Sequence, residues 1–216
     1  VEMVLRNGRM KKYGDQVLGV ETGDPREFKT WEEFWNAYVK QHELFLKTAF
    51  TQQYLINKLR AEHFAQPMGS AMHDLCMKYC IDLHQEQIPE GINLGYFEYM
   101  GLGTVVDSLS AIKKYVFEEK KLTMDQLIKA IDANFEGYED VQALLRSAPC
   151  YGNNDEYADS IGREIDRISV EYGGKYSMRD LGIHNDVRYV PFTSHVPFGK
   201  VVSATPNGRT EGFPLS

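Results

Sequence analysis

Long apolar runs, blocks of positive charge and a signal-peptide pattern are missing from this sequence of 216 residues. No apolar run reaches the roughly 18 to 20 residues that a membrane-spanning helix needs, and the first residues lack the layout of a secretory signal. The formal net charge is −7, which disfavours nucleic acid and anionic membrane surfaces as partners. The sequence therefore predicts a soluble cytoplasmic protein with no membrane or nucleic-acid partner.

Cysteine is also scarce. Any disulfide scheme for Cys76, Cys80 and Cys150 leaves one thiol unpaired, and a chain of this size does not need disulfides, so reduced thiols are expected. Apolar residues make up 43% of the chain and aromatic residues 12%, which indicates a packed globular protein. The sequence begins without Met inside an amphipathic pattern and ends without a terminating helix, so we expect a fragment of a longer protein.

Helical signals dominate what is present. Thr30-x-x-Glu33 and Thr123-x-x-Gln126 are capping boxes, in which two free N–H groups of a helix start are satisfied reciprocally. Apolar residues at helical spacing predict helices over residues 30–63 (as one helix or two in series), 70–87, 104–117, 123–135, 139–146 and 156–172. A short helix over 1–5 would end at Gly8, and Gly173-Gly174 would stop the last helix.

The pattern changes near the end of the chain. Residues 187–192 and 196–202 are rich in β-branched and aromatic side chains, which predicts two strands. Four glycines between 91 and 103 would let the backbone approach a neighbour closely. The expected class is α/β, mostly helical in this chain.

Four possible metal ligands, His73, Cys76, Cys80 and His84, would share one face of the helix expected over 70–87. Their types would suit zinc. Such a helix spreads them over roughly 16 Å, far more than the roughly 4 Å between the ligands of one ion, so at most an adjacent pair could bind. We favour a structural role in a polar seam.

Turn formers, a thiol and carboxylates are concentrated between Ala148 and Asp159. Cys150 lies just before a probable helix start, where the helix dipole would lower a thiol pKa and create a nucleophile. The alternative is that Cys150 is a small buried hydrophobe and that Asn153, Asn154 and Asp155 cap the helix. We favour the alternative, because no His stands nearby in sequence as a base.

Arg188 lies in the first predicted strand, with Phe192 four residues further on and therefore on the same side of a sheet. An arginine on an apolar strand face needs a partner. The residues alone leave two partners open: Asp186 in a salt bridge, or the anion of a substrate.

Four stretches recur in order and spacing in a known family: Thr104–Glu118, Asn134–Tyr138, Tyr151–Asp159 and Ala204–Ser216. On these motifs the chain resembles the glycyl radical enzymes, the family of pyruvate formate-lyase and the diol dehydratases. Among its branches, Glu21–Arg26 and Arg188–Phe192 look most like the isethionate sulfite-lyases, which cleave a carbon–sulfur bond in 2-hydroxyethanesulfonate.

The resemblance implies a ten-stranded α/β barrel enclosed by helices, with two finger loops inside. One loop carries Cys-x-Glu and the other a radical glycine, and neither is found in this sequence. Residues 1–216 would then be the central and C-terminal part of a single catalytic domain, inactive alone. The resemblance implies no catalytic residue, cofactor or metal in this segment.

For the parent enzyme the resemblance implies a radical relay. An S-adenosylmethionine-dependent iron–sulfur activating enzyme installs the glycyl radical, a cysteine thiyl abstracts hydrogen from the hydroxyl-bearing carbon, and a glutamate takes the hydroxyl proton. The resulting ketyl expels sulfite and leaves acetaldehyde. A guanidinium matches sulfonate oxygens bidentately, so Arg188 becomes the expected substrate ligand and Phe192 a wall of the two-carbon slot.

The partners implied are isethionate, the activating enzyme and a second copy in a homodimer, in the cytoplasm or a bacterial microcompartment. Tyr151–Asp159 and Pro206–Arg209 would be scaffold, with Arg209 paired to a carboxylate and the three cysteines dispensable. Two alternatives stay open: another glycyl radical enzyme, such as a diol or hydroxyproline dehydratase or choline lyase, and a non-catalytic helical interaction module.

Overall fold

The computed structural model describes residues 1–84, 88, 94–176, 184–190 and 192–216. The chain divides into two compact units. Unit 1 contains Val1–Leu44, Tyr99–Ile168 and Tyr189–Ser216, and unit 2 contains Phe45–Glu98 and Ser169–Arg188.

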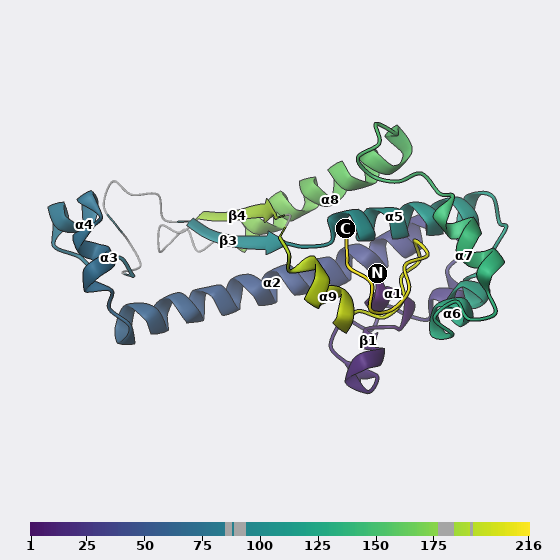
Figure 1. Cartoon of the computed structure of the whole chain (residues 1–216), viewed down its shortest axis with the longest axis horizontal. Helices are drawn as coiled ribbons and strands as arrows, with labels where there is room; N and C mark the ends of the chain where they lie inside the picture. The colour runs from purple at the N-terminus through teal and green to yellow at the C-terminus, as the bar shows by residue number, and fades with distance from the viewer. Residues whose placement is uncertain (85–87, 89–93, 177–183, 191) are drawn as a thin grey trace. The chain divides into compact units, whose positions relative to one another are not determined.

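Helices dominate both units (Figure 1). The longer ones are α2 (Trp31–His63), α5 (Leu102–Ile112), α6 (Met124–Asp132), α7 (Glu139–Arg146) and α8 (Glu156–Lys175). The shorter ones are α1 (Glu2–Leu5), α3 (Pro67–Ala71), α4 (Asp74–Tyr79) and α9 (His195–Val201), and α5 continues into a π-helical segment, Lys113–Glu118. Two-stranded sheets pair β1 (Arg9–Met10) antiparallel with β2 (Gln16–Val17), and β3 (Leu94–Tyr99) with β4 (His184–Tyr189). None of the helices in the described part of the chain combines the length and the apolarity that a membrane crossing needs.

Both predicted capping boxes are present. Glu33 N–H donates to Thr30 Oγ1 at 3.2 Å, and Thr30 N–H donates to Glu33 Oε2 at 3.2 Å. Thr123 and Gln126 make the same reciprocal pair at the start of α6. The pattern over residues 30–63 forms one helix rather than two.

The core of unit 1 is formed where α2, α5, α6 and α8 pack together. Phe34, Leu109, Ile112, Leu127 and Ile165 are almost fully buried in one cluster. Each was part of an apolar pattern at three- and four-residue spacing, which places one helix face toward the core. Burying such a side chain contributes about 1.5–3 kcal/mol, so this cluster holds the helices of unit 1 together.

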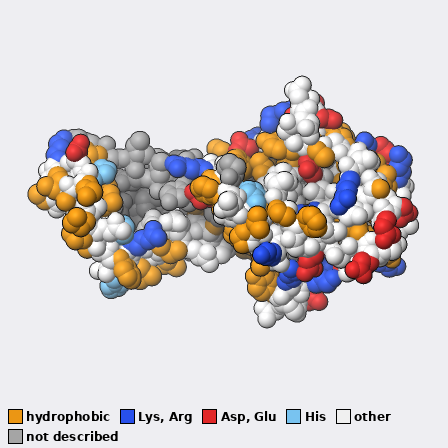
Figure 2. Space-filling view, in the orientation of Figure 1, with side chains coloured by type: hydrophobic (Ala, Val, Ile, Leu, Met, Phe, Trp, Pro, Cys, Tyr) orange, Lys and Arg blue, Asp and Glu red, His pale blue; other side chains and the backbone are white. Residues whose placement is uncertain are grey.

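Unit 2 has several large apolar side chains exposed on its surface. Leu46, Phe50 and Cys76 are buried in it, but Met68, Met72 and Met77 are exposed, and hydrophobic side chains gather over α3 and α4 in Figure 2.

The helix predicted over residues 70–87 is wrong. α4 ends at Tyr79, and Cys80 adopts the left-handed conformation, φ 54°, which terminates it. Polar contacts between residues distant in sequence stabilise the break, because Asp82 accepts hydrogen bonds from Gln66 N–H at 2.8 Å and from the Ser70 hydroxyl at 2.9 Å. Residues 85–87 lie outside the described residues.

Two expectations near the end of the chain are also wrong. α8 runs through Gly173-Gly174 to Lys175, and residues 195–201 form α9 instead of a strand. Pro197 lies in the first turn of α9. Backbone N–H groups there have no acceptor within the helix, so the N–H that proline lacks costs the helix no hydrogen bond. The other predicted strand, 187–192, overlaps β4, whereas β3 was not predicted as a strand.

Gly199 allows the backbone of the last residues to lie against α9. A Cβ at this buried position would stand 2.0 Å from the carbonyl oxygen of Phe213. Backbone cannot give way as a flexible side chain does, so the close approach requires glycine. Gly103 makes a similar approach, with a built Cβ 3.1 Å from the Ser216 carbonyl.

Gly199→Ala is expected to lower the free energy of unfolding by about 1–3 kcal/mol, because an inserted methyl overpacks the site. The matched control is Gly174→Ala. Its Cβ meets no atom within 4 Å, and alanine should stabilise α8 by up to about 1 kcal/mol. Thermal unfolding should show a lower midpoint for Gly199→Ala and an equal or higher midpoint for Gly174→Ala. Equal midpoints would contradict the steric role of Gly199.

Candidate functional site

The four His and Cys residues do not form one site. His73 precedes α4, Cys76 is buried within it, and Cys80 is exposed at its end. His84 Nδ1 instead lies 2.6 Å from the Phe64 carbonyl oxygen. Among the described residues no group of three His, Cys, Asp or Glu could hold a metal ion. The prediction that these four residues share one helix face is wrong, and the polar seam that depended on that shared face is therefore also wrong.

The stretch from Ala148 to Asp159 caps a helix, as the favoured interpretation predicted. Asp155 Oδ1 accepts a hydrogen bond from Tyr157 N–H at 2.9 Å at the start of α8. Asp159 Oδ1 accepts from Gly152 N–H at 2.9 Å and ties the loop back to the helix.

Cys150 lacks the electrostatics of a nucleophile. Burial raises the pKa of its thiol, and the nearby Asp107 carboxylate raises it further. The thiol donates a hydrogen bond to the Ala148 carbonyl at 3.4 Å. A nucleophilic cysteine needs a lowered pKa, so this thiol is a packing group.

The structure joins the four family stretches by direct hydrogen bonds. The pairs are Asp107–Tyr151, Asn134–Glu211 and Thr104–Ser216. Asp107 Oδ1 and Asn134 Oδ1 each accept from a backbone N–H at 2.7 Å, and Thr104 N–H donates to the Ser216 carbonyl at 2.9 Å. Residues that identify the family are thus a connected scaffold within unit 1.

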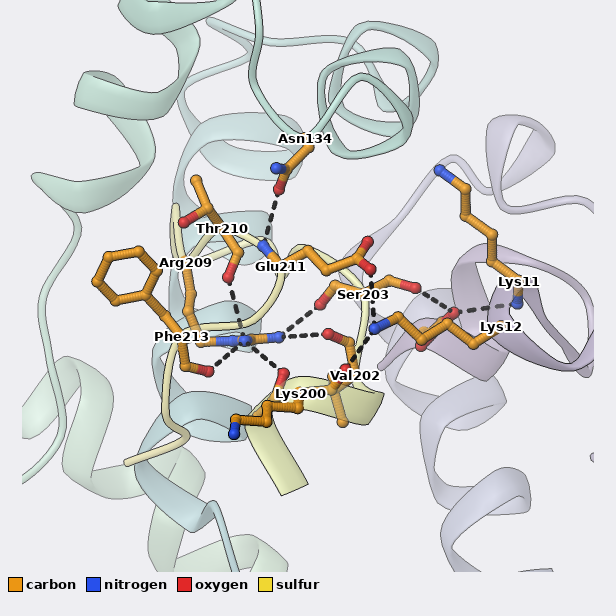
Figure 3. A network of polar contacts seen from close by, with 12 residues as sticks. Lys11, Lys12, Asn134, Lys200, Val202, Ser203, Arg209, Thr210, Glu211 and Phe213 are labelled. Atoms are coloured by element: carbon orange, nitrogen blue, oxygen red, sulfur yellow. Dashed lines mark hydrogen bonds and ion pairs between the residues drawn. The ribbon is translucent and has the colours of Figure 1, made fainter. Parts of the chain in front are cut away.

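The centre of the fourth stretch is Arg209, whose guanidinium is enclosed by backbone carbonyls (Figure 3). Nη1 donates to the carbonyls of Thr210 and Phe213 at 3.1 and 2.7 Å, and Nη2 donates to those of Val202 and Ser203. Further acceptors are the Gly199 carbonyl and the Thr205 hydroxyl.

A carboxylate partner for Arg209 was predicted, and that prediction is wrong. In the described part of the chain its hydrogen bonds go to carbonyl and hydroxyl oxygens, while the nearby Glu211 pairs with Lys12 at 2.8 Å. Burial lowers the pKa of the Arg209 guanidinium, although an arginine remains charged at neutral pH. The carbonyl dipoles replace water around this charge.

Arg188 lies in β4, in the strand where the sequence placed it, and its side chain is exposed. Phe192 is 56% exposed and lies beyond the strand, which ends at Tyr189. The alternation that put both side chains on one side of a sheet therefore does not extend to Phe192. The side chain of Asp186, the other predicted partner, lies outside the described residues.

A ladder of stacked rings within unit 1 includes Tyr189, the residue after Arg188, and the sequence did not predict it. Its rings belong to Tyr38, His42, Tyr99 and Tyr189, with successive centroids 5.6, 5.5 and 5.4 Å apart. The Tyr99 hydroxyl and His42 Nε2 are 3.0 Å apart. Tyr38 and His42 are four apart on α2, a spacing visible in the sequence, but Tyr99 and Tyr189 meet them only through tertiary structure.

His42 is neutral at physiological pH. Burial, with a smaller effect of the N-terminal amine, lowers its pKa from 6.5 to about 4. Burial also raises the pKa of Tyr38. The ladder therefore carries no charge near pH 7, and the hydrogen bond between His42 and Tyr99 joins a neutral imidazole to a phenol.

Comparison with known proteins identifies the same family as the four hydrogen-bonded stretches. A family profile described as pyruvate formate lyase-like matches residues 1–199. The chain is 90% identical over all its 216 residues to the isethionate sulfite-lyase of Desulfovibrio desulfuricans, and 76% identical to that of Oleidesulfovibrio alaskensis. It spans 26% of the length of each.

Among solved structures, the hydroxyproline dehydratase of Clostridioides difficile superimposes on the whole chain with a TM-score of 0.90 at 36% identity, and the chain covers 27% of it. The fold is accordingly that of a segment of the glycyl radical enzymes. The chain belongs to the pyruvate formate lyase-like family.

Replacing Arg209 by methionine should lower the free energy of unfolding by about 1.5–3 kcal/mol, because several carbonyls, most of them half-buried, lose a charged donor. Arg163→Met is the matched control, since Arg163 is exposed and pairs with an exposed carboxylate, Glu156. Thermal unfolding should shift strongly for the first variant alone. Similar shifts for both would contradict the role of the carbonyl cage.

Acid should destabilise the fold through His42. Between its folded pKa of about 4 and its ordinary 6.5, the unfolded chain binds a proton that the folded chain excludes, so stability falls as pH falls. We expect a loss of about 2 kcal/mol between pH 7 and pH 5. His42→Gln should remove that part of the pH dependence in urea unfolding, whereas His73→Gln, at an exposed histidine, should keep it. An unchanged slope in His42→Gln would contradict a buried neutral imidazole.

Proposed function

We propose that the chain is part of an enzyme that splits isethionate into acetaldehyde and sulfite. The observation that carries the proposal is that relatives with the same fold differ widely in sequence identity to this chain. Identity is 90% over the whole chain with an isethionate sulfite-lyase, against 36% with a hydroxyproline dehydratase that has a TM-score of 0.90. We further propose that residues 1–216 belong to a single pyruvate formate-lyase-like catalytic domain.

In the proposed reaction the carbon–sulfur bond breaks, the hydroxyl-bearing carbon becomes an aldehyde carbon, and sulfur leaves as sulfite. A glycyl radical, installed by an S-adenosylmethionine-dependent iron–sulfur activating enzyme, supplies hydrogen abstraction through residues outside this chain. The partners proposed for the full-length protein are the activating enzyme and a second copy in a homodimer, in the cytoplasm or a microcompartment.

The proposed contribution of this chain is to bind and orient the substrate. The planar guanidinium of Arg188 can donate two parallel hydrogen bonds to sulfonate oxygens, and its exposure in β4 leaves it accessible in this segment. Phe192 is an exposed aromatic ring that would form an apolar wall beside the two-carbon chain. None of Cys76, Cys80 and Cys150 is assigned a catalytic role.

The test uses the full-length protein that contains this chain, activated without oxygen and supplied with isethionate. We expect sulfite and acetaldehyde in equal amounts. Arg188→Lys should raise the KM for isethionate by about 10- to 100-fold, because a charged hydrogen bond is worth about 1.5–3 kcal/mol and lysine cannot bind bidentately.

Arg163→Lys, at the exposed Arg163 of α8, is the control that keeps the charge and should leave the KM unchanged. Sulfite release with a normal KM in Arg188→Lys would remove Arg188 from the site. Turnover of hydroxyproline or a diol, with no sulfite from isethionate, would assign the protein to another branch of the family.

A further inference from the structure

Two sets of contacts within unit 1 anchor residues that follow Arg188, the last residue of unit 2. In the first set, Tyr189 immediately follows Arg188 and stacks on Tyr99 with ring centroids 5.4 Å apart. Val190 N–H donates to the Tyr99 carbonyl at 3.2 Å. Tyr99 therefore contacts these residues through both its ring and its backbone.

In the second set, His195 supplies the anchor. Its backbone N–H donates to the Phe192 carbonyl at 3.2 Å, and its Nε2 lies 3.3 Å from the Val190 carbonyl. The His195 carbonyl accepts from Leu215 N–H at 3.1 Å. His195 thus bonds the backbone of both Val190 and Phe192.

The first anchor depends on α2. The ring of His42, buried on that helix, stacks on Tyr99 with an interplanar angle of 19°, and its Nε2 is 3.0 Å from the Tyr99 hydroxyl. Tyr38 also stacks on His42, with centroids 5.6 Å apart. Stacking alone lets a ring slide in its plane, whereas the hydrogen bond fixes its position.

We infer that His42 and Tyr99 are positioning residues, which fix Tyr189 and Val190 and thereby orient the adjoining Arg188 to bind the sulfonate. The inference rests on the proposed function of Arg188. Neither residue is assigned contact with the substrate. Their effect passes through the Tyr189 ring and the Val190 backbone to the neighbouring guanidinium.

A double-mutant cycle in the activated full-length enzyme tests this inference. Tyr99→Phe keeps the ring and removes the hydroxyl, and it should raise the KM for isethionate about 10-fold while kcat changes by less than about 2-fold. In an Arg188→Lys background the same change should raise KM by less than about 2-fold, because the bidentate geometry that it supports is already lost.

Two further variants separate positioning from general stability. His42→Phe should reproduce the KM increase of Tyr99→Phe, whereas His42→Gln, whose amide can still bond the phenol, should stay within about 3-fold of the wild type. Tyr157→Phe is the matched control, because it removes another tyrosine hydroxyl, which donates to Glu118 at 2.7 Å. Its KM should not change.

Equal KM increases in both Arg188 backgrounds would overturn the inference, and so would a lowered melting temperature with an unchanged KM. If the wild-type enzyme releases no sulfite from isethionate, the proposed function fails and the inference fails with it. Sulfite release by the wild type, combined with additive effects in the cycle, would overturn the inference alone.

Discussion

The half-buried charge of Arg209 is the constraint on which the end of this chain depends. A guanidinium partly removed from water needs hydrogen-bond acceptors in place of water, and here backbone carbonyls from residues 199–213 supply them. The chain must therefore wrap around one side chain. That wrapping sets where α9 ends and brings Glu211 to Asn134 and the last residues to Thr104.

The family signatures in this chain are structural. Asp107, Asn134 and Thr104 use short polar side chains to satisfy backbone groups of other signature stretches. Such bonds need a specific side chain at a specific place, because a buried unpaired N–H costs about 1–3 kcal/mol. A recognisable motif can thus reflect the architecture around a reaction, and Cys150, with its raised thiol pKa, illustrates how a catalytic-looking stretch can be a scaffold.

Binding and support are divided between neighbouring parts of the chain. The exposed Arg188 and Phe192 are the proposed contacts with substrate, while the rings from Tyr38 to Tyr189 are buried or half-buried, stacked and uncharged near neutral pH. Lowering the pKa of His42 by burial makes its hydrogen bond to Tyr99 insensitive to ordinary changes of pH. A rigid, neutral support suits a site whose ligand carries the charge.

Local interactions are what the sequence by itself determined: both capping boxes, the helix faces with Phe34, Leu109 and Ile165, the helix cap at Asp155, and Arg188 in a strand. Periodicity and capping involve residues a few positions apart, so the sequence displays them directly. The tertiary structure alone decided the break at Cys80, the helix at 195–201, the carbonyl partners of Arg209 and the meeting of His42 with Tyr99 and Tyr189. Each depends on groups far apart in the chain, whose contacts outweigh local propensities of well under about 1 kcal/mol per residue.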